Sequence, residues 1–490
     1  MEGFFADGLR SARYDVWEES RESRESMVSG QPPPPAPVHA LQAMFHIPRQ
    51  GGERSLRPDY VAKTTLSGRL YGRSKKVFAG GVNHNARFYS PYPLFLKRAN
   101  GQHVWDEDGN RYVDYWMGHL ALILGHSPAV VVEALRRQVG RGTHYGMSSR
   151  MSLELGEEVQ RSVPCAEMLR FCNSGAEATM YLVRLARAYT RRSTAIKIAG
   201  GWHGYNTELN KGVHRPFDRA EGEGILPSEQ SSLITVRFND LEAVERAMRE
   251  ARHDVAVVFL EPVLGAGGCI PADPAYLKGL RELTQHDGAL LAFDEIITGY
   301  RLSLGGAQER YGVKPDLASL GKIVGGGLPI GLVCGQREII SMADPSRRDR
   351  FVSIGGGTFS ENPLSMAAGL ATTKFLRRNR GKVYLRLEEA GKRLRSGVDR
   401  AFDERGIQTH TTGMGSLFFT HFGPKPMSAE DAAAEDKTLA MGYAMHLLSN
   451  GVFVLPGHAG AVSTSHQNAD IDRLIRASSD YASTISTGTK

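Results

Sequence analysis

The stretch PDLASLGKIVGGGLPIG, residues 315–331, contains the most informative residue of this chain, Lys322. Apolar residues and three consecutive glycines surround this lysine. Most lysines are solvated, whereas burial in such surroundings lowers the pKa of the amine and makes its free base available. A P-loop would need glycine at position 316 and serine or threonine at 323, where this chain has Asp316 and Ile323. We therefore interpret Lys322 as a buried, reactive amine.

An acidic residue, Asp294, follows the apolar run ALLAF within ALLAFDEI (289–296). A buried strand that ends in a carboxylate presents it at the edge of a sheet, although a helix cap or a loop salt bridge would give the same pattern. Beside an amine such as Lys322, the acid can hold the proton of a cofactor nitrogen. Ile296 lies two residues further, points the same way along a strand, and could pack behind a cofactor ring.

A helix start, NSGAEATM (173–180), supplies the third element. Ser174 and Glu177 make an S-x-x-E capping box, and Gly175 lets the backbone approach a ligand. The amides at such a helix start bind anions, although a plain helix cap has the same pattern. An amine, an acid and an anion cradle together suit pyridoxal 5′-phosphate (PLP): the amine forms a Schiff base, the acid holds the pyridinium proton, and the cradle takes the phosphate. The sequence therefore predicts an enzyme that acts on carbon–nitrogen bonds.

Two further glycine-rich stretches contain residues suited to such a cofactor. GGWHG (200–204) carries Trp202 and His203, and the tryptophan could stack on a cofactor ring or lie in the core beside a turn. GGGTFSENP (355–363) carries Thr358, whose hydroxyl could complete a phosphate site or serve only the turn. Glu261, like Asp294, stands where an apolar run ends.

Helical and strand-like segments alternate between about 150 and 335. The strand candidates are MLRFCNS, TAIKIAG, SLITVRF, VAVVFLEP, ALLAFDEI and GLVCG, and the segments between them, such as ATMYLVRLARAYTRR and DLEAVERAMREAR, have helical periodicity. This order predicts an α/β fold with a mostly parallel sheet, helices on both faces, and ligands at the carboxyl ends of the strands. We expect two short strands around Asp108-Gly109 and mainly helices after about 365. The predicted divisions are an appendage (1–55), the first part of a small domain (56–120), a large cofactor domain (121–365) and the rest of the small domain (366–490).

Composition excludes several classes of protein. The 490 residues are 41% hydrophobic, and the net charge of +7 comes from 60 basic and 53 acidic residues without a basic run that interleaves with aromatics, so we expect no nucleic-acid partner. No apolar run is long enough to span a membrane. The four cysteines lack metal-ligand spacing, which favours reduced thiols, no metal site and a cytoplasmic protein. The low-complexity segments SRESRES and QPPPPAP predict an extended or disordered start, and its acidic residues argue against a targeting peptide.

From about residue 80 to 475 the chain resembles the class III aminotransferases, PLP enzymes of fold type I. The resemblance rests on FCNSGAEATM, GGWHG, FLEPV, AFDEIITGYR and GGGTFSENPLSMAAG, together with the lysine stretch. DEIITGYR…GGAQ is similar to the glutamate-1-semialdehyde aminomutase branch, and NARFYSPYPL is similar to β-phenylalanine aminotransferases.

The resemblance implies a role for each matching residue. Lys322 would form the Schiff base and shuttle the proton, and Asp294 would pair with the pyridine nitrogen. The other residues implied at the cofactor are Ser174, Gly175 and Ala176 at the phosphate, Trp202, His203, Glu261 and Ile296 around the ring, and Thr358 at the phosphate of the neighbouring subunit. This last role implies a homodimer with shared active sites. Arg87 matches the arginine that binds a substrate carboxylate, and Tyr89, His119 and His458 are the other predicted substrate residues.

Several positions depart from the aminomutase pattern. Ala266 replaces an asparagine, His119 stands where a tryptophan is expected, and the segment around His458 lacks the expected glutamate. Gly457 stands where β-phenylalanine aminotransferases have an arginine. The sequence therefore predicts a PLP-dependent aminotransferase that uses a small amino donor and a carbonyl acceptor. The alternatives are glutamate-1-semialdehyde 2,1-aminomutase, an amino-acid racemase or decarboxylase, and a non-catalytic PLP-binding regulator, for which residues 1–55 are too short to form a DNA-binding domain.

Overall fold

The computed structural model describes residues 57–487, so the predicted appendage of residues 1–55 lies outside the described part. Its centre is a seven-stranded sheet in the order β4-β12-β11-β10-β7-β5-β6. Strand β12 runs antiparallel to both neighbours, and the other paired strands of this sheet are parallel. The strands are β4 (Met168–Cys172), β5 (Thr194–Ile198), β6 (Leu233–Val236), β7 (Val255–Leu260), β10 (Leu290–Asp294), β11 (Leu317–Gly321) and β12 (Gly331–Gly335). The predicted α/β fold with a mostly parallel sheet is confirmed.

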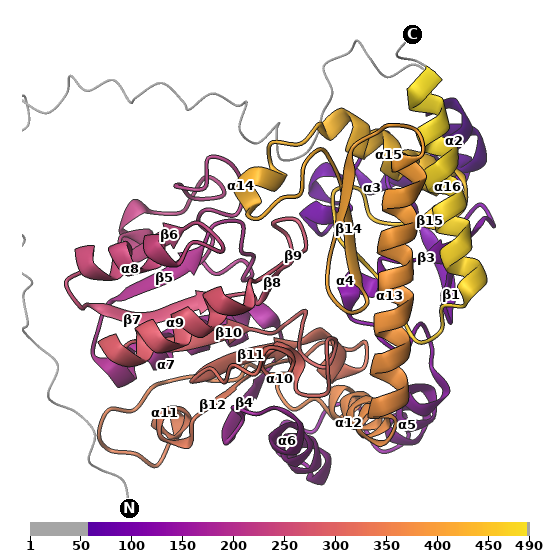
Figure 1. Ribbon diagram of the computed structural model, residues 1–490. Helices are drawn as coiled ribbons and strands as arrows, with labels where there is room; N and C mark the ends of the chain where they lie inside the picture. The colour runs from indigo at the N-terminus through magenta and orange to yellow at the C-terminus, as the bar shows by residue number, and fades with distance from the viewer. Residues whose placement is uncertain (1–56, 488–490) are drawn as a thin grey trace, which may run out of the picture.

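Helices cover both faces of this sheet (Figure 1). Side chains alternate along a strand, so Leu290 and Ala292 of β10 pack in the cluster that contains α7 (Gly175–Thr190). Leu291 and Phe293 pack on the opposite side, in the cluster that contains α8 (Leu241–Glu250) and α9 (Pro274–Asp287). Because both faces are covered, the strand ends are the part of the sheet open to a ligand.

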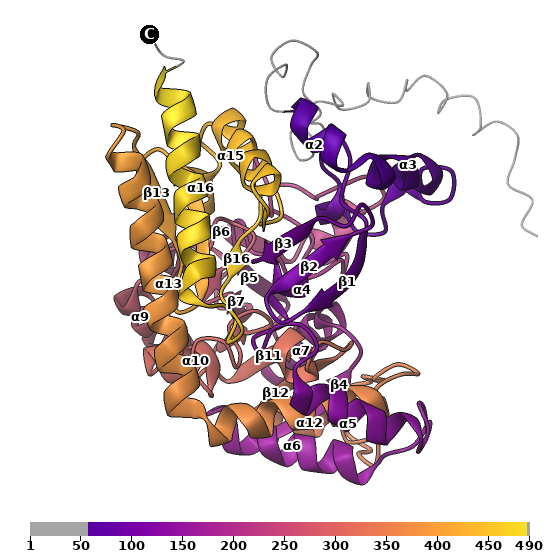
Figure 2. The same ribbon diagram turned by 90° about the vertical axis from the view of Figure 1, so that its right-hand side faces the viewer.

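A second region combines both ends of the described chain (Figure 2). Strand β15 from the C-terminal part pairs with β3 and completes the sheet β1-β2-β3-β15. The predicted strands around Asp108-Gly109 are β2 and β3 of this sheet, and β1 precedes them. The long helices α13 and α16 pack against each other beside it.

The remaining elements complete these layers. The strands are β1 (Leu96–Asn100), β2 (His103–Asp106), β3 (Arg111–Asp114), β8 (Val263–Leu264), β9 (Ile270–Pro271), β13 (Thr409–Thr412), β14 (Leu417–Phe422), β15 (Val452–Phe453) and β16 (Gly460–Ala461). The helices are α2 (Arg57–Lys63), α3 (Thr65–Ser74), α4 (Met117–Leu120), α5 (Ala129–Val139), α6 (Arg150–Ser162), α10 (Gly306–Tyr311), α11 (Arg337–Ile340), α12 (Pro363–Arg378), α13 (Arg380–Asp403), α14 (Ala429–Ala432), α15 (Lys437–Ser449) and α16 (Asn468–Thr487). Within residues 57–487, no helix is both long and apolar enough to cross a membrane.

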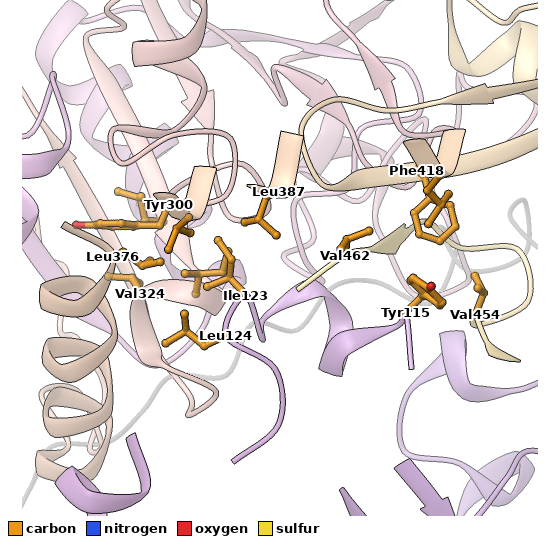
Figure 3. Packing of buried hydrophobic residues seen from close by; sticks show 14 of the residues in the cluster. Tyr115, Ile123, Leu124, Tyr300, Val324, Leu376, Leu387, Phe418, Val454 and Val462 are labelled. Carbon is orange, nitrogen blue, oxygen red and sulfur yellow. The ribbon is translucent and has the colours of Figure 1, made fainter. Parts of the chain in front are cut away.

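The largest hydrophobic cluster joins the two regions (Figure 3). At one end Ile123 packs near Tyr300 and Val324, and at the other end Tyr115 lies near Phe418. Tyr115 and Ile123 flank the short element α4, which is therefore anchored in the core on both sides. All four cysteines are buried and free.

Candidate active site

Three ionisable side chains lie where three neighbouring strands end. Lys322 directly follows β11, Asp294 is the last residue of β10, and Glu261 directly follows β7. These strands are adjacent in the order β11-β10-β7 and run parallel, so their carboxyl ends meet at one edge of the sheet. The structure thus brings the predicted amine and the predicted acids together at the predicted edge.

The carboxylate of Asp294 is fixed by three hydrogen bonds and is only 3% exposed. Its Oδ2 lies 2.8 Å from Nδ1 of His203, and its Oδ1 accepts hydrogen bonds from the Ser319 hydroxyl (3.1 Å) and the Ile296 amide (3.0 Å). The His203 ring packs against Phe259 at 4.3 Å between centroids, and burial lowers its pKa although Asp294 opposes this. Asp294 is therefore held in one orientation by neighbours that are themselves buried.

Glu261 and Lys322 influence each other through the same buried environment. The Glu261 carboxylate accepts hydrogen bonds from the amides of Trp202 (2.9 Å) and Gly265 (3.1 Å). Burial, with Asp294 adding to it, raises the pKa of Glu261 to about 8. Burial lowers the pKa of Lys322 to about 8, although Asp294 and Glu261 favour its charged form. An appreciable fraction of the amine is therefore uncharged near neutral pH, as a nucleophile requires.

The start of α7, the predicted anion cradle, is a capped helix N-terminus. Oε2 of Glu177 accepts hydrogen bonds from the amides of Asn173 (2.6 Å) and Ser174 (3.0 Å), and Oγ of Ser174 accepts one from the Glu177 amide (3.3 Å). This capping box leaves the first-turn amides of Gly175 and Ala176 without intrahelical acceptors, at the positive end of a 16-residue helix. A side chain at Gly175 would place its Cβ 2.9 Å from Cδ1 of Ile296, so glycine is needed where these segments meet.

The loop that carries Trp202 and His203 is held by a residue that the sequence analysis missed. Lys197, in β5, is fully buried, and its Nζ donates hydrogen bonds to the carbonyls of Gly201 (2.9 Å), Leu209 (3.0 Å) and Lys211 (2.7 Å). The signal in the sequence was a lysine within the apolar run TAIKIAG. Lys197 connects the end of the sheet to the whole of this loop.

Element α4 is a left-handed turn. Its four residues Met117–Leu120 have φ values of 46°, 58°, 60° and 65°, and only Gly118 adopts this conformation without strain. Left-handed backbone costs other residues roughly 1–2 kcal/mol each. Oδ1 of Asp114 accepts the amide hydrogens of Trp116 (2.7 Å) and Met117 (3.1 Å), and the buried Arg301, which the sequence analysis also missed, donates to the Leu120 carbonyl. His119 therefore lies within the left-handed backbone, between the segment that Asp114 stabilises and the carbonyl that Arg301 binds.

This turn places His119 among other aromatic rings close to the amine. Its ring centroid lies 4.3 Å from that of Trp116 and 4.6 Å from that of His84. Burial, with smaller contributions from His84, Arg87 and Lys322, lowers the pKa of His119 to about 3. His458 lies 5.4 Å from Trp116. The structure thus brings Arg87, His119 and His458 to the side of the site where a substrate would lie.

Two predicted residues lie elsewhere. Tyr89 is buried in the small hydrophobic cluster with Tyr60 and Tyr112, and its hydroxyl accepts a hydrogen bond from the Leu94 amide (2.9 Å), so its role at the substrate stays a prediction. Thr358 is exposed on a loop beside α7, where the Gly356 carbonyl accepts a hydrogen bond from the Asn173 side chain (3.2 Å). Its role at a second subunit stays a prediction.

The residues present fit PLP. Asp294 can accept a hydrogen bond from a protonated pyridine nitrogen, Lys322 provides a buried amine, and the start of α7 provides free amides for a phosphate. Trp202 and Ile296 are available for the two faces of the ring, and the glycines permit the close approach that such a ring requires. Within residues 57–487, no group of three or more histidine, cysteine or acidic side chains is arranged to hold a metal ion.

Comparison with known proteins gives a consistent result. The model of the class-III aminotransferase family matches residues 84–466. A curated glutamate-1-semialdehyde 2,1-aminomutase from Methanosphaera stadtmanae is 39% identical over 419 residues, which are 85% of this chain and 97% of that protein. Among solved structures, an omega-transaminase from Sphaerobacter thermophilus aligns with a TM-score of 0.81 at 31% identity, covering 85% of this chain and 97% of the other.

Two further solved structures match similarly. A β-phenylalanine aminotransferase from Variovorax paradoxus aligns with a TM-score of 0.79 at 30% identity, covering 87% of this chain and 95% of the other. A transaminase with PLP bound aligns with a TM-score of 0.80 at 30% identity, covering 87% of this chain and 99% of the other.

Proposed function

Because this chain belongs to the class III aminotransferases, which are PLP-dependent enzymes, we propose that it moves an amino group to a carbonyl carbon with Lys322 as the reactive amine. The observation that carries this proposal is the placement of Lys322, Asp294 and Glu261 at three adjacent strand ends. When bound, PLP supplies a conjugated ring that withdraws electrons from the carbon next to the transferred nitrogen.

Each residue of the chain then has a defined task. Lys322 holds the cofactor, gives up its place to the substrate amine, and moves a proton at the substrate carbon with its Nζ. Asp294 keeps the proton on the ring nitrogen, and His203 and Ser319 keep its carboxylate aimed at that proton. Trp202 covers one face of the ring and excludes water from it.

We further propose a homodimer in which Thr358 contacts the phosphate bound by the partner. In the single chain, Thr358 is exposed, and its neighbour Phe359 is 60% exposed. Met147 and Leu153 are 79% and 64% exposed, which is unusual for large apolar side chains. Phe359 also contacts His144, at 5.2 Å between ring centroids, so these segments belong to one surface that a second copy can cover.

The first substrate to test is glutamate-1-semialdehyde, converted by an intramolecular 2,1-amino shift. The curated relatives carry this activity in their names at 37–39% identity over more than four fifths of the chain, which favours the aminomutase over a general aminotransferase. The second candidate is an aminotransferase that uses separate donor and acceptor molecules. It is favoured by Ala266, His119 and His458, which stand where the resemblance to aminomutases leads us to expect other side chains.

One experiment tests the proposal and separates the two candidates. The purified enzyme with PLP is incubated with glutamate-1-semialdehyde alone, and 5-aminolevulinate is measured. Product without any added amino acceptor supports the aminomutase, whereas product or cofactor conversion only with a separate donor and acceptor supports the aminotransferase. Lys322→Ala should lose the visible absorption of the lysine-bound cofactor and all amino transfer; a variant that keeps both would refute the role of Lys322.

A further inference from the structure

Six aromatic rings form a continuous row beside the cofactor site, here called the ring wall: Trp202, Tyr205, His84, His119, Trp116 and His458. Consecutive ring centroids lie 4.6, 6.4, 4.6, 4.3 and 5.4 Å apart. The rings come from segments far apart in the chain, and the row extends from the tryptophan proposed to cover the cofactor to the loop after β15. A row assembled in this way forms one surface along which a substrate can lie.

The surroundings of the ring wall favour the uncharged form of its three histidines. Burial is the largest cause of the lowered pKa of His84, His119 and His458. The positive charges of Arg87 and Lys322 lower the pKa values of His84 and His119 further, because a second cation beside them is unfavourable. Arg87 is therefore the fixed positive charge beside an otherwise neutral wall.

Hydrogen bonds to the backbone determine which ring nitrogens of these histidines can donate or accept a hydrogen bond. Nδ1 of His84 accepts the Ala86 amide hydrogen (3.1 Å), so the proton of this ring lies on Nε2. Nδ1 of His458 donates to the Pro456 carbonyl (3.0 Å), so its Nε2 keeps a lone pair. Nε2 of His119 is buried and, among the described residues, has no hydrogen-bond partner. The wall thus offers a donor, an acceptor and an unsatisfied ring nitrogen, but no charge.

We propose that the ring wall selects a substrate whose far end is uncharged, so that the enzyme acts on monocarboxylates whose single carboxylate is held by Arg87. This rests on the proposed function and on the carboxylate role that the resemblance implies for Arg87. A second carboxylate would lose its water against neutral rings, which is unfavourable without a cation. An ammonium group at the far end would be repelled by Arg87 and Lys322. An amide, alkyl or aryl end suits the wall.

The test uses two probes that carry no amine and so cannot react. Glutarate and its monoamide, glutaramate, have nearly the same shape but differ by one negative charge. Their dissociation constants for the holoenzyme are measured by isothermal titration calorimetry at pH 7.5. We expect glutaramate to bind at least about tenfold more tightly, which corresponds to one unpaired buried polar group. Equal binding, tighter binding of glutarate, or no binding of glutaramate would overturn the proposal.

A charge introduced into the wall provides the converse test. His119→Lys places a cation in the wall and should raise the affinity for glutarate at least about tenfold. The control is His119→Asn, because asparagine is neutral and tolerates left-handed backbone. This control should not raise the affinity for glutarate. If His119→Lys does not fold, the comparison of glutarate with glutaramate on the wild-type enzyme still tests the proposal. The proposed function fails separately: an enzyme that shows the absorption of bound PLP but transfers no amino group from any donor refutes the function, whereas the relative affinity of the two probes is independent of turnover.

Discussion

Lys197 should hold the cofactor-binding loop, and its removal has a calculable effect. Its ammonium donates to three carbonyls at 2.7–3.0 Å, and three hydrogen bonds from a charged donor are worth roughly 5–9 kcal/mol in gross terms. Burying the ammonium costs several kcal/mol, lowers the pKa of Lys197 to about 7 and offsets most of that gain. Lys197→Met keeps the volume of the side chain but leaves three carbonyls unpaired, at about 1 kcal/mol each, so we expect a loss of about 3 kcal/mol.

Lys197→Met should weaken cofactor binding as well as lower the free energy of unfolding, because the three carbonyls belong to the loop that carries Trp202 and His203. Urea unfolding of the apoenzyme measures the global part, and the dissociation constant of PLP, followed by its visible absorption, measures the local part. We expect PLP to bind at least about tenfold more weakly. Lys278→Met is the control, since Lys278 is 76% exposed in a surface pair with Glu282. If Lys197→Met matches wild type in both measurements, the carbonyl contacts do not hold the loop.

Two further predictions concern the buried charges. Burial holds the pKa of Glu261 at about 8 in the folded protein against an ordinary 4.5, so between these values the folded state binds a proton that the unfolded state has lost, and stability falls as the pH rises. The buried histidines, whose pKa values are lowered, act in the opposite sense below pH 6.5, so the contribution of Glu261 is read as a difference between two proteins. In urea titrations of the apoenzyme at about pH 5 and pH 8, Glu261→Gln should gain more stability, or lose less, than the wild type as the pH rises. The same change in both proteins would contradict the role given to Glu261. Arg301→Met removes the donor to the Leu120 carbonyl and should lower the free energy of unfolding by roughly 2–4 kcal/mol, whereas Arg249→Met, at a 66% exposed side chain, should not. Equal losses in the two arginine variants would contradict a specific role for Arg301.

The parts of the site that the sequence predicts are those in which a local pattern carries the chemistry. The acid after ALLAF, the capping box of Ser174 and Glu177, and the lysine beside three glycines each combine a residue type with a fixed place in an element. The six predicted strands of the sheet were found for the same reason, since apolar runs of this length between helices are strands. Strand β11 was missed, because LASLG combines alanine, serine and glycine, which have low β propensity, and becomes a strand only through its pairing with β10 and β12.

Residues that act through distant partners left no local signal. Arg301 lies within the motif DEIITGYR, but its contact with the Leu120 carbonyl joins positions 181 residues apart. The left-handed backbone of Met117–Leu120 could not be predicted, because three of its four residues disfavour that conformation. Arg87 and Tyr89 are two residues apart in the sequence, but Arg87 is exposed and Tyr89 lies in the core, a difference that no local pattern indicates.

The charges at the strand ends explain why the site retains two buried acids. If Lys322 and Asp294 were the only charged residues here, their charges would cancel. A positive charge on a ring nitrogen would then be stabilised only weakly. Glu261 adds a second potential negative charge, and Asp294 makes its ionisation harder, as the raised pKa of Glu261 reflects. A proton that arrives on a ring nitrogen beside Asp294 would relieve this repulsion, so bound cofactor and ionised Glu261 favour each other. The two amides that bind Glu261 belong to Trp202 and Gly265. The charge state of the sheet edge is therefore connected directly to Trp202, the residue proposed to cover the cofactor ring.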